Sequence, residues 1–285
     1  MLVHASAKLN LSLDVLRRTP DGYHDLRMVM QSVEFGDDLE IELTTDGSFS
    51  IEPGQRYLPA DDRNLAVRAA KAFLRNSGLG ASIRTVKRTP VCAGMGGGSS
   101  DAAAVLRALN RLTGAGKSPA ELCALGGEIG SDVPFCILGG TMLAEGRGQL
   151  LTPLPPLPDC AIVICKPSFA ISTPELFSRI DRRRSRLRPD TSGLTAALSA
   201  GDLPGAARRM YNVFEDVLDR RQGDILSIKS RLLDLGAIGA AMTGTGSAVF
   251  GVFSDEAAAQ TAHAALSAHY RECWLTRPSP AEKFD

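Results

Sequence analysis

The chain has 285 residues, enough for one large domain or two of ordinary size. Hydrophobic residues make up 44% and charged residues 22%, which is the balance of a globular protein with a sizeable core. The 32 basic residues equal the 32 acidic ones, and aromatic residues make up only 5%. We therefore exclude a globally basic nucleic-acid binder, a broadly membrane-adherent surface and an extended base-stacking platform.

The N-terminus and the cysteines both favour a cytoplasmic protein. The first residues lack the basic stretch and apolar run of a signal peptide, and no uncharged apolar run approaches the roughly 20 residues of a membrane span. The six cysteines include no C-x-x-C pair, and most have apolar neighbours, so we expect reduced core residues rather than zinc ligands or disulfides. We predict neither a membrane nor a nucleic-acid partner.

The first half of the chain alternates between strand and helix patterns. The predicted elements are strands at 6–15, 28–33 and 39–43, a turn at 20–23, a helix at 64–75 capped by Asn64 and a strand at 81–88. A glycine-rich loop at 94–101 then opens onto a helix at 102–112, and a capping box at Ser118 starts the next helix. After Asp132 we expect a pair of strands broken at Gly139 and Gly140.

Four prolines within residues 153–158 give the best candidate for a linker between domains. The elements predicted beyond it are a strand at 161–165, a short helix from Thr173, two or three helices between 193 and 235, a strand at 247–253, a helix at 255–270 and a strand near Trp274. Because strands and helices intermingle, we predict an α+β fold in two domains, at residues 1–152 and 159–285.

The glycine-rich loop indicates a phosphate site. Three consecutive glycines before a helix leave backbone N–H groups open to phosphate oxygens, and the serines that follow add donors or a metal contact. The alternative is a flexible turn in which Ser99 or Ser100 caps the helix. A cap needs one serine and no run of glycines, so the pattern favours phosphate binding. The loop matches neither the P-loop nor the dinucleotide-binding pattern.

Lys8 and Asp132 are candidates for catalysis. Lys8 has apolar residues on both sides in a predicted strand, where an ammonium can hold a substrate oxygen or a carboxylate. Asp132 lies in a rigid turn before Val133 and Pro134, where a carboxylate can accept the proton of an attacking hydroxyl. Taken singly, each also fits an ordinary position: a solvent-facing strand residue for Lys8, and a turn residue or helix cap for Asp132.

Two other stretches allow more than one interpretation. The small-residue loop at 243–247 leads into a strand and suits either a hairpin turn or a ligand contact. The arginine-rich stretch at 182–188 has no interleaved aromatic residue, and Pro189 and Asp190 follow it. We therefore favour a solvated loop over a site for RNA or an acidic partner.

Three of these features occur in an order that is typical of one superfamily. The strand Ala7-Lys8-Leu9-Asn10-Leu11, the loop Pro-x-x-x-Gly-x-Gly-Gly-Gly-Ser-Ser and the late Thr-Gly-Thr-Gly loop resemble the three motifs of the GHMP kinases, which include galactokinase, homoserine kinase and mevalonate kinase. Residues 21–24 and 130–134 resemble those of a member whose substrate carries a cytidine diphosphate group. The resemblance extends from Ala7 to about Phe250.

The resemblance implies a two-domain kinase with an N-terminal ATP-binding domain, a C-terminal α/β-sandwich domain and an active site in the cleft between them. ATP would phosphorylate a hydroxyl of a small molecule that carries cytidine diphosphate, and Mg²⁺ is inferred from the ATP chemistry. Lys8 and Asp132 match the catalytic pair, with Asp132 as the base and Lys8 neutralising charge.

The resemblance also assigns the binding residues. Positions that match the ATP site are Asn64, Lys87, Gly94, Gly96, Gly97, Gly98, Ser99 and Ser100. Positions that match the substrate site are Asn10, Tyr23, His24, Thr173, Phe177, Thr243 and Gly244. In the family, two aromatic rings sandwich the cytosine, here Tyr23 and Phe177, and the backbone of the histidine recognises its polar edge.

The sequence departs from the family pattern at the start of the loop and just after it. Cys92 and Ala93 stand where glycine is frequent, and Asp101 replaces an asparagine found in some members. Because the phosphate-facing glycines are intact, we still expect triphosphate binding. A carboxylate cannot donate a hydrogen bond as an amide does, so Asp101 is not expected to repeat an amide contact to adenine.

Two other functions compete with this one. A GHMP kinase that acts on mevalonate, homoserine or a sugar would keep the ATP loop but would not need Tyr23, His24 and Phe177. A non-catalytic nucleotide-binding or RNA-associated module would not need Lys8 or Asp132, and both are present.

Overall fold

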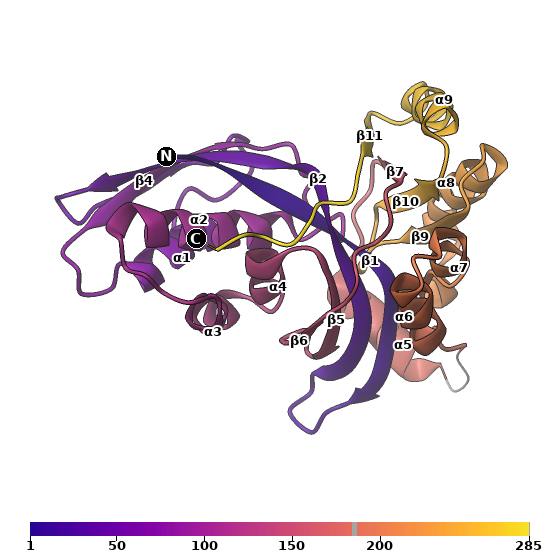
Figure 1. Cartoon of the computed structure of the whole chain (residues 1–285), viewed down its shortest axis with the longest axis horizontal. Coiled ribbons are helices and arrows are strands. Elements are labelled where there is room, and N and C mark those ends of the chain that lie inside the picture. The colour runs from indigo at the N-terminus through magenta and orange to yellow at the C-terminus, as the bar shows by residue number, and fades with distance from the viewer. Residues whose placement is uncertain (184–186, 285) are drawn as a thin grey trace.

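The computed structural model describes residues 1–183 and 187–284, which form one sheet of seven strands and one of four (Figure 1). The elements of the first half are β1 (Leu2–Arg18), β2 (His24–Thr44), β3 (Phe49–Glu52), α1 (Leu65–Phe73), β4 (Gly80–Val86), α2 (Gly97–Thr113), α3 (Pro119–Ile129), α4 (Val133–Leu138), β5 (Thr141–Gly146) and β6 (Leu150–Pro153).

The elements of the second half are β7 (Ala161–Lys166), α5 (Thr173–Arg182), α6 (Thr191–Ser199), α7 (Leu203–Ala207), β8 (Tyr211–Asn212), the 3₁₀ helices η1 (Val213–Val217) and η2 (Arg220–Gln222), α8 (Gly223–Asp234), β9 (Gly239–Met242), β10 (Val249–Phe253), α9 (Glu256–Ser267) and β11 (Glu272–Thr276). No helix in the described part of the chain combines the length and apolar character needed to cross a membrane.

The first sheet is built on the long antiparallel pair β1–β2, which bends between the two halves of the molecule (Figure 1). β2 pairs with β4 along residues 38–44 and with β5 along residues 26–31, so two different strands share its outer edge. β3 extends the sheet beside β4, β6 beside β5, and β8 of the second half pairs in parallel with β1. Through β8, the second half contributes a strand to the first sheet.

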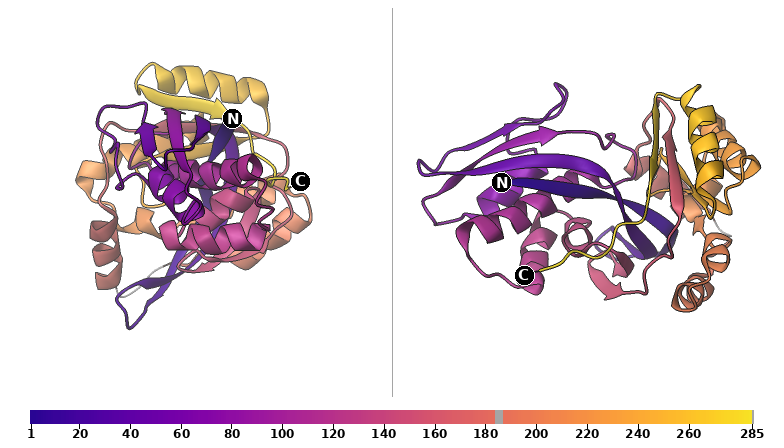
Figure 2. Two further views of the ribbon diagram at one scale, coloured as in Figure 1. Left: turned by 90° about the vertical axis from the view of Figure 1, so that its left-hand side faces the viewer. Right: turned by 45° about the horizontal axis from the view of Figure 1, so that its top comes forward.

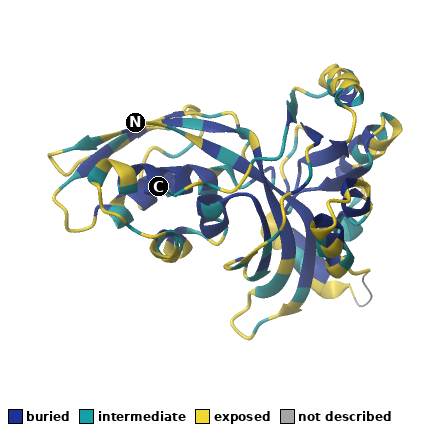
Figure 3. Ribbon diagram, in the orientation of Figure 1, coloured by how far each residue is buried: buried dark blue, intermediate teal, exposed yellow. Residues whose placement is uncertain are grey.

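The second sheet has the order β11-β7-β10-β9. All five residues of β10 and all six of β7 are buried, as the dark strands in Figure 3 show. Helices α8 and α9 contact this sheet. On its other side, Ile162, Ile164 and Phe250 share a core with Leu9 and Leu11 of β1, because side chains of a strand alternate between its faces. This core joins the two sheets.

Several elements differ from the sequence predictions. Where a pair of strands was predicted after Asp132, the structure has the short helix α4, and the strand pair β5–β6 follows only after Gly140, so the first strand of that prediction is wrong. A six-residue apolar run does not distinguish a helix from a strand, and Pro134 in the first helical turn favours the helix. Helix α2 also begins earlier than predicted, at Gly97 instead of 102.

The last residues of the chain return to the first half. After β11, residues 277–284 run beside β2 and the end of α4 (Figure 2), and the backbone O of Lys283 accepts from Arg111 of α2 at 3.3 Å. The backbone N–H of Ser279 donates to Ser32 O at 2.8 Å, and that of Glu282 donates to Leu138 O at 2.8 Å. The sequence did not predict this return.

Candidate active site

A cavity of about 1490 Å³ lies between the two halves. Its lining comes from β1, the start of α2 and the loop before α4 in the first half, and from α5 and the loop at 244–246 in the second. All but two of the predicted site residues line it, namely Lys8, Asn10, Tyr23, His24, Asn64, Lys87, Gly94, Gly96, Gly97, Gly98, Ser99, Asp132, Thr173, Phe177 and Gly244. The two exceptions are Ser100 and Thr243.

Lys8 and Asp132 face each other in this cavity. The Lys8 side chain is only 6% exposed, which removes the solvent-facing alternative, and its Nζ lies 3.7 Å from Asp132 Oδ2. The same Nζ donates to Asn10 Oδ1 at 2.7 Å. Asp132 occupies the N-cap position of α4, yet within the described chain its carboxylate makes no capping hydrogen bond. Its carboxylate, 32% exposed, therefore remains able to accept a proton from a group in the cavity.

The glycine loop ends in the N-terminus of a 17-residue helix. Gly96, with φ of 69°, is the N-cap of α2, so neither Ser99 nor Ser100 is the cap. The first hydrogen bond of the helix runs from Ser100 N to Gly96 O, which leaves the N–H groups of Gly97, Gly98 and Ser99 at the positive end of the helix. A Cβ at Gly96 would lie 3.0 Å from Lys8 Cγ, so a glycine there lets the loop approach the lysine.

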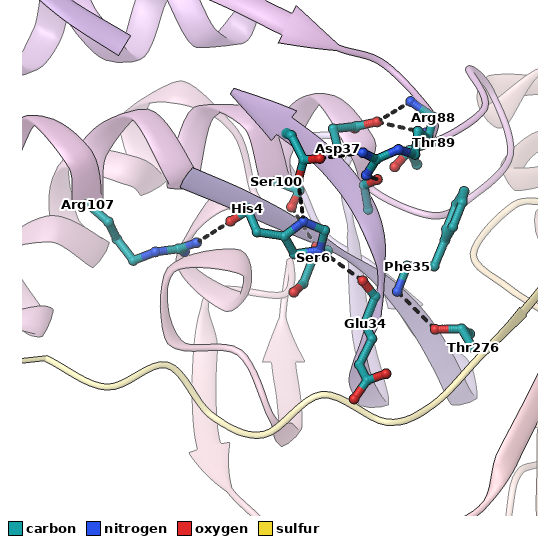
Figure 4. Close-up of polar contacts among 12 residues, drawn as sticks. His4, Ser6, Glu34, Phe35, Asp37, Arg88, Thr89, Ser100, Arg107 and Thr276 are labelled. Carbon is teal, nitrogen blue, oxygen red and sulfur yellow. Dashed lines mark hydrogen bonds and ion pairs between the residues drawn. The ribbon is translucent and has the colours of Figure 1, made fainter. Parts of the chain in front are cut away.

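Thr243 and Ser100 are buried, and their hydroxyls connect the loops of the site to one another and to β1. Thr243 Oγ1 donates to Gly94 O at 3.0 Å and accepts from Asn10 N at 3.1 Å. Gly244 N donates to Asn10 Oδ1 at 3.0 Å, which ties the 243–246 loop to the residue that holds Lys8. Ser100 Oγ donates to Ser6 O of β1 at 2.5 Å (Figure 4). The 243–246 loop is thus both the turn between β9 and β10 and a part of the site.

A chain of three charged groups lies on the other side of the glycine loop. Lys87 Nζ donates to Asp37 Oδ2 at 2.6 Å and to Asp101 Oδ2 at 2.5 Å. Asp37 also accepts from the backbone N–H groups of Arg88 and Thr89 (Figure 4). Burial, aided by the charge of Asp37 and opposed by that of Lys87, raises the pKa of the Asp101 carboxyl to about 7. Asp101 shares the lysine with Asp37, a fully buried carboxylate that also accepts two backbone hydrogen bonds.

The far end of the cavity is aromatic. The His24 ring stacks on Phe177, with centroids 4.6 Å apart and planes at 26°. Phe177 also meets Phe214 in a T-shaped contact at 5.0 Å. Tyr23 is 58% exposed, and the guanidinium of Arg147 lies 3.8 Å from its ring centroid. Thr173, at the start of α5, shares a 2.7 Å hydrogen bond between hydroxyls with Thr245.

Residues of the lining that sequence reasoning did not single out include Arg18, Arg147, Asp181 and Phe214. A signal for Asp181 was available, since it lies one helical turn after Phe177 in a helix that was predicted to start at Thr173. Arg147 lies in the turn between β5 and β6, outside every motif, and nothing in the sequence singled it out.

The structure also shows the state of the six cysteines and the place of part of the arginine-rich stretch at 182–188. All six cysteines are free thiols, but only Cys136, Cys160 and Cys165 are buried. Cys123 and Cys273 are half-buried and Cys92 is exposed, so the prediction of a core residue is wrong for Cys92. Burial raises the pKa of Cys136 to about 12. Of the stretch 182–188, residues 184–186 lie outside the described part of the chain. Arg188 donates to Asp14 Oδ1 at 2.8 Å and is therefore anchored to β1.

The comparisons with known proteins agree with this architecture. Residues 64–140 match the GHMP kinases N terminal domain, and residues 194–272 match the GHMP kinases C terminal domain. The chain belongs to the GHMP kinase family. It is therefore a phosphotransferase, and membership of this family implies that ATP is the phosphoryl donor.

Among its relatives the chain is similar to the 4-diphosphocytidyl-2-C-methyl-D-erythritol kinases. The one from Alkaliphilus metalliredigens is 40% identical over 281 residues, which is 98% of this chain and 97% of the relative, and the one from Acetivibrio thermocellus is 40% identical over 275 residues, which is 96% of this chain and 97% of the relative. The crystal structure of a 4-(cytidine 5'-diphospho)-2C-methyl-D-erythritol kinase superimposes with a TM-score of 0.84, at 33% identity and over 98% of this chain and 99% of that chain.

Proposed function

We propose that this chain transfers the γ-phosphoryl group of ATP to the 2-hydroxyl of 4-diphosphocytidyl-2-C-methyl-D-erythritol, in the non-mevalonate route to isoprenoid precursors. The observation that carries the proposal is one cavity that brings together a helix N-terminus, the Lys8–Asp132 pair and an aromatic end. A kinase for mevalonate or homoserine would need the first two features and not the third. The relatives at 40% identity point to the same substrate.

The catalytic roles follow from the geometry of the pair. Asp132 accepts the proton of the substrate hydroxyl while that oxygen bonds to the γ-phosphorus and the bond from the β–γ bridging oxygen to phosphorus breaks, which releases ADP. Lys8, held at 2.7 Å by Asn10, places a buried positive charge beside the transferring group. In a site shielded from water such a charge stabilises the transition state more than it would in solution.

Backbone groups bind the triphosphate in this proposal. The N–H groups of Gly97, Gly98 and Ser99 point out of the N-terminus of α2, and Gly94 and Gly96 shape the loop around the phosphates. Asn64 and Lys87 line the cavity beyond the loop and are proposed to lie beside the nucleoside.

Mg²⁺ would accompany ATP as its phosphate complex. The described residues contain no group of three or more His, Cys, Asp or Glu side chains able to hold a metal ion. This fits an ion that keeps several waters and takes most of its ligands from the phosphates, as Mg²⁺ does in many kinases. When bound, it neutralises charge on the phosphate oxygens.

The aromatic end is proposed to hold the cytosine, between Tyr23 and Phe177 and against the backbone of His24. Asn10, Thr173 and Gly244 also line the cavity and would hold the alcohol portion. Thr243 is proposed to act through Gly94 and Asn10 rather than by touching the substrate. We propose domain limits at 1–152 and 159–285, with residues 277–284 returning across the boundary.

The test is ATP turnover by the purified protein with 4-diphosphocytidyl-2-C-methyl-D-erythritol, mevalonate and homoserine as separate acceptors. We expect turnover with the cytidyl substrate alone and a product that carries the phosphate on the 2-oxygen, as phosphorus NMR would identify. Turnover of mevalonate or homoserine without the cytidyl substrate would refute the proposed acceptor.

A further inference from the structure

One helix of the second half holds the first residue of β2 at two points. Phe177 and Asp181 are four residues apart on α5, so their side chains project from the same face of the helix. Phe177 stacks on the His24 ring, and Asp181 Oδ1 lies 2.8 Å from His24 Nε2. The His24 side chain is 9% exposed between these contacts. Both the face and the edge of the ring are therefore fixed by α5.

His24 sits where its position matters to the aromatic end of the cavity. It opens β2 directly after Tyr23 and pairs with Arg18 of β1, so it sets the end of the β1–β2 hairpin. Its ring covers one face of Phe177, which leaves the proposed cytosine to stack on the opposite face. The direction of the His24 ring thus decides which face of Phe177 receives the base.

We propose that Asp181 is a positioning residue for the pyrimidine nucleoside diphosphate portion of the acceptor, acting through His24. The inference rests on the proposed function and assigns no chemical step to Asp181. The carboxylate accepts from the His24 ring, and the ring in turn fixes the hairpin backbone and the free face of Phe177. The sequence motifs do not include Asp181, and it touches neither Lys8 nor Asp132.

Electrostatic repulsion alone predicts that removal of the Asp181 charge has the opposite effect on affinity. Asp181 is an anionic group that lines a cavity proposed to bind a diphosphate, so its charge repels the ligand. If repulsion were its only effect, removal of the charge would tighten binding of cytidine diphosphate. If the hydrogen bond to His24 dominates, removal of the carboxyl loosens binding. The direction of the change therefore separates the two roles.

The experiment compares Asp181→Ala, Asp181→Asn and the control Glu175→Ala. Glu175 lies on the same helix, and its side chain pairs with Arg179 rather than with the hairpin. Calorimetry gives the Kd of cytidine diphosphate, and steady-state kinetics give kcat and the KM values of the cytidyl substrate and of ATP. Thermal melting confirms that each variant is folded.

For Asp181→Ala we expect the Kd of cytidine diphosphate and the acceptor KM to rise roughly five- to tenfold, the scale of one lost hydrogen bond to a charged group at a half-exposed site. The KM of ATP and kcat should stay within about twofold of wild type, the usual scale of a change remote from a site. Asp181→Asn keeps an acceptor oxygen and should restore most of the affinity, and Glu175→Ala should match wild type.

An unchanged or lower acceptor KM in Asp181→Ala, or an equal rise in both KM values, overturns the positioning role. A wild-type protein that binds no cytidine diphosphate overturns the proposed function and this inference with it. A wild-type protein that binds and phosphorylates the cytidyl substrate while Asp181→Ala behaves like wild type overturns the positioning role alone.

Discussion

At the scale of single residues, Asp132 has the clearest consequence. Its carboxylate lies 3.7 Å from the Lys8 ammonium and makes no capping bond within the described chain, although it occupies the N-cap position of α4. A group placed this way is available for proton transfer, and it adds little to the stability of the helix. We therefore expect a substitution of Asp132 to affect catalysis far more than it affects folding stability.

Asp132→Ala should lower kcat at least ~100-fold while the Kd of the cytidyl substrate changes little, because a general base acts in the transition state and not in substrate binding. Steady-state kinetics and calorimetry measure the two quantities. A fall in kcat accompanied by an equal loss of ATP affinity and a lower melting temperature would mean that the variant is misfolded, and it would remove Asp132 from the catalytic role.

Asp101 gives a prediction about pH. Burial, with the charge of Asp37, raises the pKa of Asp101 to about 7 from its ordinary 3.8, whereas the pKa of Lys87 is raised above its usual 10.5 because the two carboxylates outweigh the effect of burial. Between about pH 4 and pH 7 the folded state therefore binds more protons than the unfolded chain does. The stability that Asp101 contributes is complete below about pH 4 and is lost as the pH rises through about 7.

Asp101→Asn removes this titration. We expect the free energy of unfolding of wild type, relative to the variant, to fall by on the order of 2 kcal/mol between pH 5 and pH 8, because this interval covers one to two of the pH units over which the folded and unfolded states bind different numbers of protons. Urea unfolding of both proteins without ATP at several pH values measures it. Parallel pH profiles for wild type and Asp101→Asn would contradict the raised pKa.

At the scale of elements, the glycine loop and the 243–246 loop depend on each other. Gly94 has φ of 76°, and a Cβ placed on it would lie 2.1 Å from Thr243 O. The hydrogen bond from Thr243 Oγ1 to Gly94 O sits at the same contact. The two loops come from opposite halves of the molecule, so this contact sets the width of the cavity between them.

Gly94→Ala should therefore weaken ATP binding and lower stability. Gly116→Ala is the matched control, since Gly116 also has a positive φ of 63° but no described atom lies within 4 Å of its Cβ position. Both variants carry the strain of the left-handed region, about 1 kcal/mol, and only Gly94→Ala adds a collision. We expect urea unfolding to show a further loss of roughly 1–3 kcal/mol for Gly94→Ala. Equal losses would show that the loops adapt to the added methyl group.

The elements also show what the sequence could and could not predict. The helix start at Ser118 and the strand at 161–165 follow local signals, a capping box and an unbroken apolar run, and both are confirmed. The helix at 133–138 was missed because its apolar run suits either structure. Strand β9, with the sequence Gly-Ala-Ala-Met, has little strand propensity and forms because β10 pairs with it in a buried sheet.

For site residues the limit lies in side-chain direction. The motifs located the loops, and most of their residues do line the cavity. A motif does not say which side of the backbone a serine or threonine occupies, so Ser100 and Thr243 were assigned to ligands although their hydroxyls bond to backbone atoms of β1 and of the glycine loop. Only the tertiary pairing of the two loops determines this.

At the scale of the whole molecule, the cavity is assembled from segments more than 200 residues apart in sequence, such as Asn10 and Gly244. The balanced net charge of the chain does not prevent the cavity from binding anions, because the positive potential there is local. It comes from the N-terminus of α2 and from Lys8 and Lys87. The composition excludes a globally basic surface, but it does not locate a local positive site such as this cavity.

The returning tail connects the chain's end to the same site. Asp132 is the N-cap of helix α4, and the last carbonyl of that helix, from Leu138, accepts from Glu282 N at 2.8 Å. Arg107 of α2 donates to Cys136 O in the middle of α4 at 2.6 Å and pairs with Glu282 Oε1 at 3.1 Å. The tail and α2 therefore hold the helix that presents the proposed base.

Glu282→Gln tests this connection by removing a charge and almost no volume. The Arg107 side chain is 8% exposed, and burial lowers its pKa while the Glu282 carboxylate opposes that effect. Without the carboxylate the buried guanidinium loses its counter-charge, so we expect urea unfolding to show a loss of roughly 1–3 kcal/mol. Lys283→Gln, at the exposed neighbouring position, is the control and should stay within about 0.5 kcal/mol of wild type.

Because α4 also carries Asp132, kcat should fall in Glu282→Gln while the KM of ATP is unchanged. Identical unfolding and kinetics for the two variants would show that the tail only covers the first half and does not hold α4.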